Sequence, residues 1–137
     1  MTEPTSPTER QARCSCGQLT LTVTGEPVRV SICHCRACQR RTGSVFGVQA
    51  RFDRGQITVA GQSQTYLRTA DSGNPLSFHF CPDCGSTVYY SLDQLPDVIA
   101  VPVGAFADQA FPAPGVSVYE ARQHAWVRVP EDITHHD

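Results

Sequence analysis

The feature that most constrains this chain is its set of seven cysteines, which fall into three short groups. The first group is Cys14-Ser15-Cys16-Gly17, the second runs from Cys33 to Cys38, and the third is Cys81-Pro82-Asp83-Cys84-Gly85. Seven cysteines cannot all pair within one chain, and the polar N-terminal segment 1–7 lacks the apolar stretch of a secretion signal. We therefore expect a cytoplasmic protein whose cysteines bind metal rather than form disulfides.

The third group has the pattern of a zinc knuckle. Two intervening residues let both sulfurs reach one metal ion, and the glycine that follows accepts the positive φ of such a turn. One knuckle supplies only two ligands, and the first group offers the complementary pair because it ends in the same Cys-Gly step. The two pairs predict a closed, structural zinc site formed by Cys14, Cys16, Cys81 and Cys84. The alternative for the third group is a redox dithiol.

The middle group leaves Cys33, Cys35 and Cys38 for a second site. Three protein ligands with a free fourth position are typical of a catalytic zinc, and an exogenous thiolate is a natural fourth ligand. The alternatives are a structural site completed by His34 or another histidine, and an iron–sulfur cluster. The sequence thus favours two Zn²⁺ ions per chain, one structural and one catalytic.

Composition narrows the class of protein further. A length of 137 residues with 40 % apolar residues predicts one domain with one core. The formal net charge of −2 gives no electrostatic reason to expect nucleic acid or an anionic membrane as a partner. No apolar run approaches the roughly 20 residues that span a bilayer.

The pattern of apolar residues favours a mostly β fold. Leu19, Leu21 and Val23 alternate with threonines, which is a strand signal, and no stretch keeps a helical period over ten residues. A short helical turn is predicted over 36–41, ended by Gly43, and the chain divides into a disordered tail 1–11, a zinc-binding domain 12–130 and a C-terminal tail 131–137. Further strands are predicted at 45–48, 57–59, 76–80, 87–90, 98–101, 116–119 and 126–129.

The three cysteine groups together with Thr42-Gly43-Ser44 resemble the family of glutathione-dependent formaldehyde-activating enzymes, to which the centromere protein V group belongs. The resemblance spans roughly residues 12–130. It implies a β-tent fold of antiparallel sheets, a structural zinc at the outer two cysteine pairs and a catalytic zinc at the middle group. The family's reaction joins formaldehyde to the thiol of glutathione, giving S-(hydroxymethyl)glutathione, and its class is carbon–sulfur lyase.

These observations give two hypotheses of different kinds. The first is a zinc-dependent carbon–sulfur lyase that acts on a small thiol adduct, with Cys33, Cys35 and Cys38 as ligands of the catalytic zinc and glutathione as the thiol partner. The second is a zinc-stabilised binding module without catalysis, or a thiol or zinc sensor.

Other residues carry weaker signals. Arg36, Arg40 and Arg41 either bind the carboxylates of glutathione or form a solvated helical face. His79 is either a surface histidine or a proton carrier near zinc, and Trp126 is expected in the core or in a pocket wall with His124 nearby.

Overall fold

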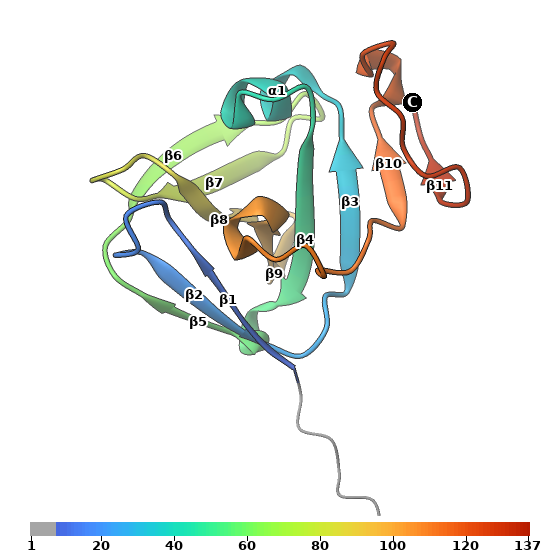
Figure 1. The fold of residues 1–137 in the computed structure, drawn as a ribbon. Coiled ribbons are helices and arrows are strands. Elements are labelled where there is room, and N and C mark those ends of the chain that lie inside the picture. Colours follow the sequence, from blue (N-terminus) through green and yellow to red (C-terminus); the bar gives the residue numbers. More distant parts are fainter. Residues whose placement is uncertain (1–7) are drawn as a thin grey trace, which may run out of the picture.

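The computed structural model describes residues 8–137, which form two β-sheets joined by short turns (Figure 1). The helical segments are α1 (Arg36–Thr42) and the 3₁₀ turns η1 (Arg54–Gln56), η2 (Val103–Phe106) and η3 (Glu120–Arg122). The strands are β1 (Glu9–Arg13), β2 (Thr20–Thr24), β3 (Arg29–Cys33), β4 (Gly47–Asp53), β5 (Ile57–Ala60), β6 (Gln64–Thr69), β7 (Pro75–Phe80), β8 (Thr87–Leu92), β9 (Leu95–Pro102), β10 (Val116–Val118) and β11 (Thr134–His135). The mostly β fold expected from the sequence is confirmed.

The smaller sheet has the strand order β1-β2-β5, and the larger has the order β11-β10-β3-β4-β9-β8-β7-β6. All pairs are antiparallel except β10 with β3 and β11 with β10, which are parallel. The smaller sheet leans against the larger one across η2 (Figure 1). No helix of the described part is long and apolar enough to cross a membrane.

The main core lies between the two sheets and follows from period-two alternation. Leu21 and Val23 of β2 face Phe52 of β4 and Val101 of β9, and all four are fully buried. Phe106 of η2 stacks on Phe111 and fills the open end of this core.

Alternate residues of the larger sheet point away from that core. A second, smaller apolar cluster lies on this opposite face and contains Leu76, Phe78, Tyr90 and Ala100. Phe78 and Tyr90 are cross-strand partners whose rings stack at 4.7 Å. The central strands of the larger sheet therefore bury side chains on both faces, and the second face also carries the polar groups described below.

The chain ends differ from the sequence prediction. Residues 1–7 of the expected tail lie outside the described part, but β1 begins at Glu9, because Arg10 pairs with Glu26 and lies 5.0 Å from the ring of Phe111. In the expected C-terminal tail, β11 pairs with β10. The strand predicted at 126–129 is wrong: this segment forms turns.

Candidate metal centres and an adjoining cavity

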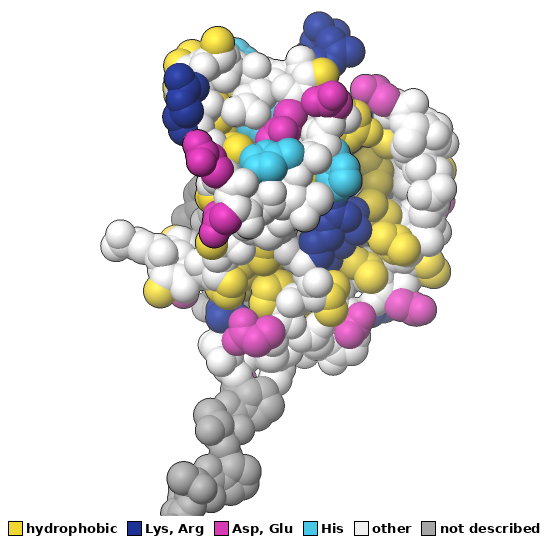
Figure 2. All heavy atoms as spheres, turned by 90° about the vertical axis from the view of Figure 1, so that its right-hand side faces the viewer, with side chains coloured by type: hydrophobic (Ala, Val, Ile, Leu, Met, Phe, Trp, Pro, Cys, Tyr) yellow, Lys and Arg dark blue, Asp and Glu magenta, His cyan; other side chains and the backbone are white. Residues whose placement is uncertain are grey.

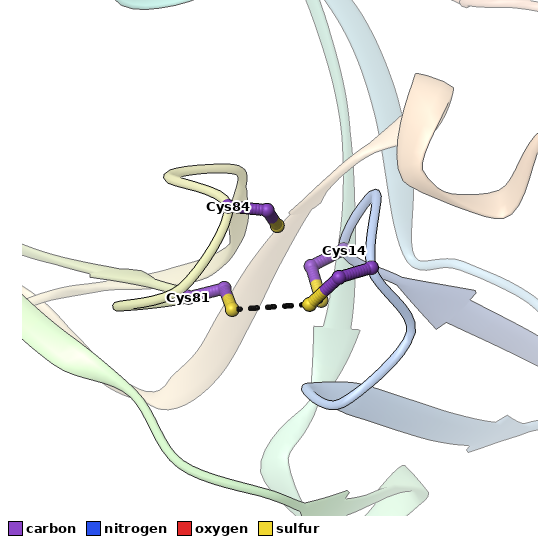
Figure 3. A group of neighbouring side chains, drawn as sticks. Cys14, Cys81 and Cys84 are labelled. Atoms are coloured by element: carbon purple, nitrogen blue, oxygen red, sulfur yellow. Dashed lines mark hydrogen bonds between the residues drawn. The ribbon is translucent and has the colours of Figure 1, made fainter.

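The outer cysteine pairs meet as the sequence predicts. Cys14 and Cys16 lie in the turn between β1 and β2, and Cys81 and Cys84 lie in the turn between β7 and β8 (Figure 3). The four sulfur atoms all lie within 4.8 Å of one another. Gly85 has φ +81°, the left-handed conformation that the knuckle turn requires.

The surroundings of these sulfurs suit thiolates. The backbone N–H of Leu19 points at Cys14 Sγ at 3.3 Å, and the backbone N–H of Asp83 points at Cys81 Sγ at 3.3 Å. The side-chain amide of Gln18 donates to Cys81 Sγ at 2.9 Å. Hydrogen bonds from such donors stabilise negative sulfur, and four converging thiolates need a cation to offset their charge. The residues present therefore fit a tetrahedral thiophilic metal ion.

The two exposed thiols of this cluster differ: against a backbone hydrogen bond from Gln18 that lowers it, the hydrogen bond with Cys14 helps raise the pKa of Cys16 to about 12. The backbone N–H of Ser86, followed by that of Cys16, lowers the pKa of Cys84 to about 5. A pKa in that range keeps the sulfur deprotonated at neutral pH, which is the form that binds metal.

The middle cysteines form a second, separate cluster. Cys33 ends β3, Cys35 caps the N-terminus of α1, and Cys38 lies in its first turn, where its backbone N–H donates to Cys35 Sγ at 3.4 Å. Their sulfurs lie within 4.8 Å of one another. Hydrogen bonds from the thiols of Cys33 and Cys38 lower the pKa of Cys35 to about 2, and the same bond with Cys35 raises the pKa of Cys33. This arrangement also fits a metal ion, but with three sulfurs rather than four.

His34 does not complete the second cluster. Its ring is fully buried, and Nε2 lies 2.9 Å from Oγ of Ser117 in β10. Within residues 8–137, no histidine or carboxylate joins the three sulfurs. The side chain instead ties β3 to β10.

All three cysteines of the middle cluster line one cavity of about 160 Å³ on the second face of the larger sheet. Its wall also carries four guanidinium groups and one carboxylate. These belong to Arg29, Arg41, Arg51, Arg68 and Asp71, and Ser31, Gln49 and Tyr90 line the same cavity. In the four-sulfur cluster, by contrast, every coordination position of a tetrahedral ion has a protein sulfur to fill it.

Aromatic rings hold two of the arginines. Arg41 lies over Phe78 at 5.8 Å and over Tyr90 at 5.5 Å, and Arg68 lies over Phe78 at 5.5 Å. Burial raises the pKa of Tyr90, so its phenol stays protonated at neutral pH. The rings fix the guanidinium groups in place while leaving their N–H donors free for a ligand.

The arginines expected at the site are only partly those found there. Arg41 lines the cavity, and Arg40 lines a neighbouring, wider hollow of about 590 Å³, but Arg36 lines neither. Sequence reasoning missed Arg29, Arg51 and Arg68. A usable signal existed, because polar Arg29, Ser31 and Cys33 alternate with apolar residues along β3 and so share one face.

The remaining candidate residues lie elsewhere. His79 stacks on Tyr89 at 4.4 Å, and its Nδ1 lies 3.3 Å from the hydroxyl of Thr65. His124 Nε2 lies 3.2 Å from the amide oxygen of Gln39 in α1. Trp126 is 68 % exposed, so its expected place in the core is wrong, because the segment around it turns outward instead of forming a strand.

A family model described as glutathione-dependent formaldehyde-activating enzyme matches residues 9–122. The chain belongs to this family. The match covers both cysteine clusters and the arginines of the cavity wall. The family resemblance drawn from the cysteine spacing is thus confirmed.

Among solved structures, the crystal structure of a Rhodobacter sphaeroides protein resembles this chain with a TM-score of 0.53 and 21 % sequence identity. The similarity covers 69 % of this chain and 85 % of that one, and it concerns the fold. Among curated proteins, none matches this chain.

Proposed function

We propose that this protein is a zinc-dependent carbon–sulfur lyase that interconverts formaldehyde, a small thiol and the S-hydroxymethyl adduct of that thiol, with glutathione as the expected thiol. The supporting observation is that three converging thiols, one short of a tetrahedral set, all line one cavity. Family membership supports the same chemistry. Seven free cysteines are in keeping with a reducing compartment such as the cytoplasm.

The two clusters have different roles in this proposal. Cys14, Cys16, Cys81 and Cys84 would hold a structural Zn²⁺, and Cys33, Cys35 and Cys38 would hold the catalytic one. A Zn²⁺ ion bound to the second cluster would keep the sulfur of the thiol substrate deprotonated and hold it in place.

The chain's own residues supply orientation and a hydrogen-bond donor. In the synthetic direction the substrate sulfur forms a bond to the formaldehyde carbon, the C=O double bond becomes a single bond, and the proton lost by the thiol ends on the new hydroxyl oxygen. The Tyr90 phenol lines the cavity and can donate a hydrogen bond to that oxygen as charge builds on it. Thiols add to formaldehyde without help, so holding both reactants in one cavity supplies most of the acceleration.

The test compares metal content and catalysis in the same samples. Zinc per chain is measured by elemental analysis, and adduct formation from formaldehyde and glutathione is followed by NMR exchange spectroscopy against the uncatalysed background. The variants are Cys35→Ser in the second cluster and, as a matched control, Cys16→Ser in the first. We expect about two zinc ions in the wild type, one in each variant that remains folded, and exchange above background in the wild type and in folded Cys16→Ser but not in Cys35→Ser.

Two results would contradict the proposal. Two zinc ions without exchange above background would refute glutathione–formaldehyde chemistry and leave another thiol substrate or a zinc-stabilised binding module. Full exchange by Cys35→Ser, with its zinc content reduced by one, would show that the second cluster has no part in the reaction.

A further inference from the structure

The far end of the cavity holds two arginines that face each other. Arg29 of β3 and Arg51 of β4 are direct cross-strand partners in an antiparallel pair. Like charges placed opposite each other destabilise a sheet. Burial lowers the pKa of Arg51, and the neighbouring charge of Arg29 lowers it further. The fold thus keeps two guanidinium groups together at a cost in stability.

No acidic side chain of the described chain forms an ion pair with Arg29 or Arg51. Within residues 8–137, the ion pairs are those of Arg10 with Glu26 and of His135 with Glu120. Asp71 shares the cavity wall but forms no ion pair with the arginines there. The Nε of Arg29 is buried and has no hydrogen-bond partner in this part of the chain. An anion that enters the cavity from solution would offset the charge of the Arg29–Arg51 pair.

The arginine pair and the thiol cluster line opposite ends of the same stretch of β3 in one cavity, which we call the β3 track. Arg29, Ser31 and Cys33 share a face of β3, and all three line the cavity. At about 3.3 Å per residue, the Cα atoms of Arg29 and Cys33 lie roughly 13 Å apart. Gln49 lies between the two ends, opposite Ser31, and its amide donates to the Ser31 hydroxyl at 3.2 Å. A ligand that fits this track is narrow and has different chemistry at its two ends.

We propose that the Arg29–Arg51 pair binds the carboxylate or another anionic group of a thiol whose sulfur lies at Cys33, Cys35 and Cys38. The substrate class is then an acidic thiol whose anionic group lies several bonds away from its sulfur. The sulfur end of this assignment rests on the function proposed above, whereas the anion end rests on the arginines alone. Arg51 and Arg29 are the residues that would select acidic thiols over neutral ones.

The planar fork of arginine suits this role. Two guanidinium groups can each donate a pair of parallel hydrogen bonds to a carboxylate, a geometry that lysine does not reproduce. Arg29 and Arg51 are both half-buried, so each such bond counts for more than at a free surface. Loss of one arginine should therefore weaken binding of an acidic ligand about tenfold or more.

The experiment measures binding separately from catalysis. Isothermal titration calorimetry on the zinc-loaded protein uses three probes: glutathione, its diethyl ester, in which both carboxylates are blocked, and inorganic phosphate as a sulfur-free anion. Arg51→Gln is the test variant. Arg36→Gln is the matched control, because Arg36 carries the same charge on nearby α1 but does not line the cavity. Exchange with formaldehyde is recorded by NMR for each variant.

We expect Arg51→Gln to bind glutathione and phosphate at least about tenfold more weakly than the wild type, and Arg36→Gln to bind both as the wild type does. On the wild type, the ester should bind more weakly than glutathione. On Arg51→Gln, the ester and glutathione should bind with equal affinity. Arg51→Lys should fall between, since it keeps the charge and loses the fork. Arg51→Gln should unfold at or above the wild-type temperature without ligand, because it removes a like-charge contact.

The outcomes separate this inference from the proposed function. Binding that depends on Arg51 and on free carboxylates, without exchange above background, would uphold the anion site and refute the lyase. Exchange above background with equal binding of ester and acid would uphold the lyase and refute the anion site. Failure of both glutathione and phosphate to bind the wild type saturably would also refute the anion site.

Discussion

Replacing Gly61 with alanine should damage the first metal cluster through one backbone contact. Gly61 has φ +98°, and a Cβ at this position would lie 2.0 Å from the carbonyl oxygen of Gln18. Two hydrogen bonds join Gln18 to the backbone of Gln62, the residue after Gly61. The side-chain amide of Gln18 donates to Gln62 O at 2.8 Å, and its side-chain oxygen accepts from Gln62 N at 2.9 Å. The same amide donates to Cys81 Sγ at 2.9 Å. A shift of Gln18 therefore moves the hydrogen-bond donor of the Cys81 sulfur.

The magnitude follows from comparison with Gly73, a matched control. Gly73 has φ +90°, and a Cβ there would have nothing within 4 Å. Its alanine variant carries only the left-handed backbone cost, about 1–2 kcal/mol, reduced by about 0.4–1 kcal/mol because alanine restricts the unfolded chain. The Gly61→Ala variant adds the displacement of a backbone segment, which costs about 1–3 kcal/mol as overpacking does. We expect a loss of roughly 1 kcal/mol for Gly73→Ala and roughly 2–4 kcal/mol for Gly61→Ala.

Two assays test this difference. Urea unfolding of the zinc-saturated protein gives the loss of unfolding free energy, and competition with a chromogenic chelator gives the rate of metal release. Gly61→Ala should release metal faster than Gly73→Ala, because the amide of Gln18 no longer reaches the Cys81 sulfur in its present geometry. Stabilities of the two variants within about 0.5 kcal/mol of each other, with equal release, would refute the reasoning, since surface substitutions commonly differ by that much.

Two further predictions concern the β10–β11 side of the molecule, on the face in Figure 2 where acidic, basic and histidine side chains are interspersed. Glu120 holds the pKa of His135 above its ordinary value of 6.5, and His135 holds the pKa of Glu120 below its ordinary value of 4.5. The ion pair should stabilise the fold fully between pH 4.5 and 6.5. This stabilisation should be lost as pH falls through the lowered pKa of Glu120 or rises through the raised pKa of His135. Urea unfolding at several pH values should show that the difference in unfolding free energy between the wild type and Glu120→Gln is largest in this window, and a difference that does not change with pH would contradict the prediction. Ser117→Ala should cost about 1–3 kcal/mol in the same assay at pH 7, because it leaves the buried His34 ring without its partner, and a loss below about 0.5 kcal/mol would contradict the structural role of that bond.

The sequence predicts the metal clusters better than the cavity beside them. Ligand spacing is local chemistry: two residues between Cys81 and Cys84 bring both sulfurs to one point whatever the rest of the chain does. The arginine pair depends on register, because Arg29 meets Arg51 only when β3 and β4 pair as they do.

The chain ends show the same limit on sequence reasoning. The strand β11 has only two residues, too few to show an alternating pattern in the sequence. It forms because its backbone pairs with the free edge of β10. Alternating apolar residues near Trp126 resembled a strand, but no neighbouring strand pairs with this segment in the described fold.

The two clusters should also differ in what their metal does for the fold. The four-sulfur cluster joins the β1–β2 turn of the smaller sheet to the β7–β8 turn of the larger one, so a metal there closes a loop of about 70 residues between Cys14 and Cys84. Closing so long a loop restricts the unfolded chain strongly, as a disulfide of that span does. Cys33, Cys35 and Cys38 lie close together in the sequence, at the junction of β3 and α1. A metal ion there closes only a short loop, so it restricts the unfolded chain little. We therefore expect a metal ion at the four-sulfur cluster to stabilise the fold, and a metal ion at Cys33, Cys35 and Cys38 to exchange a fourth ligand without unfolding the protein.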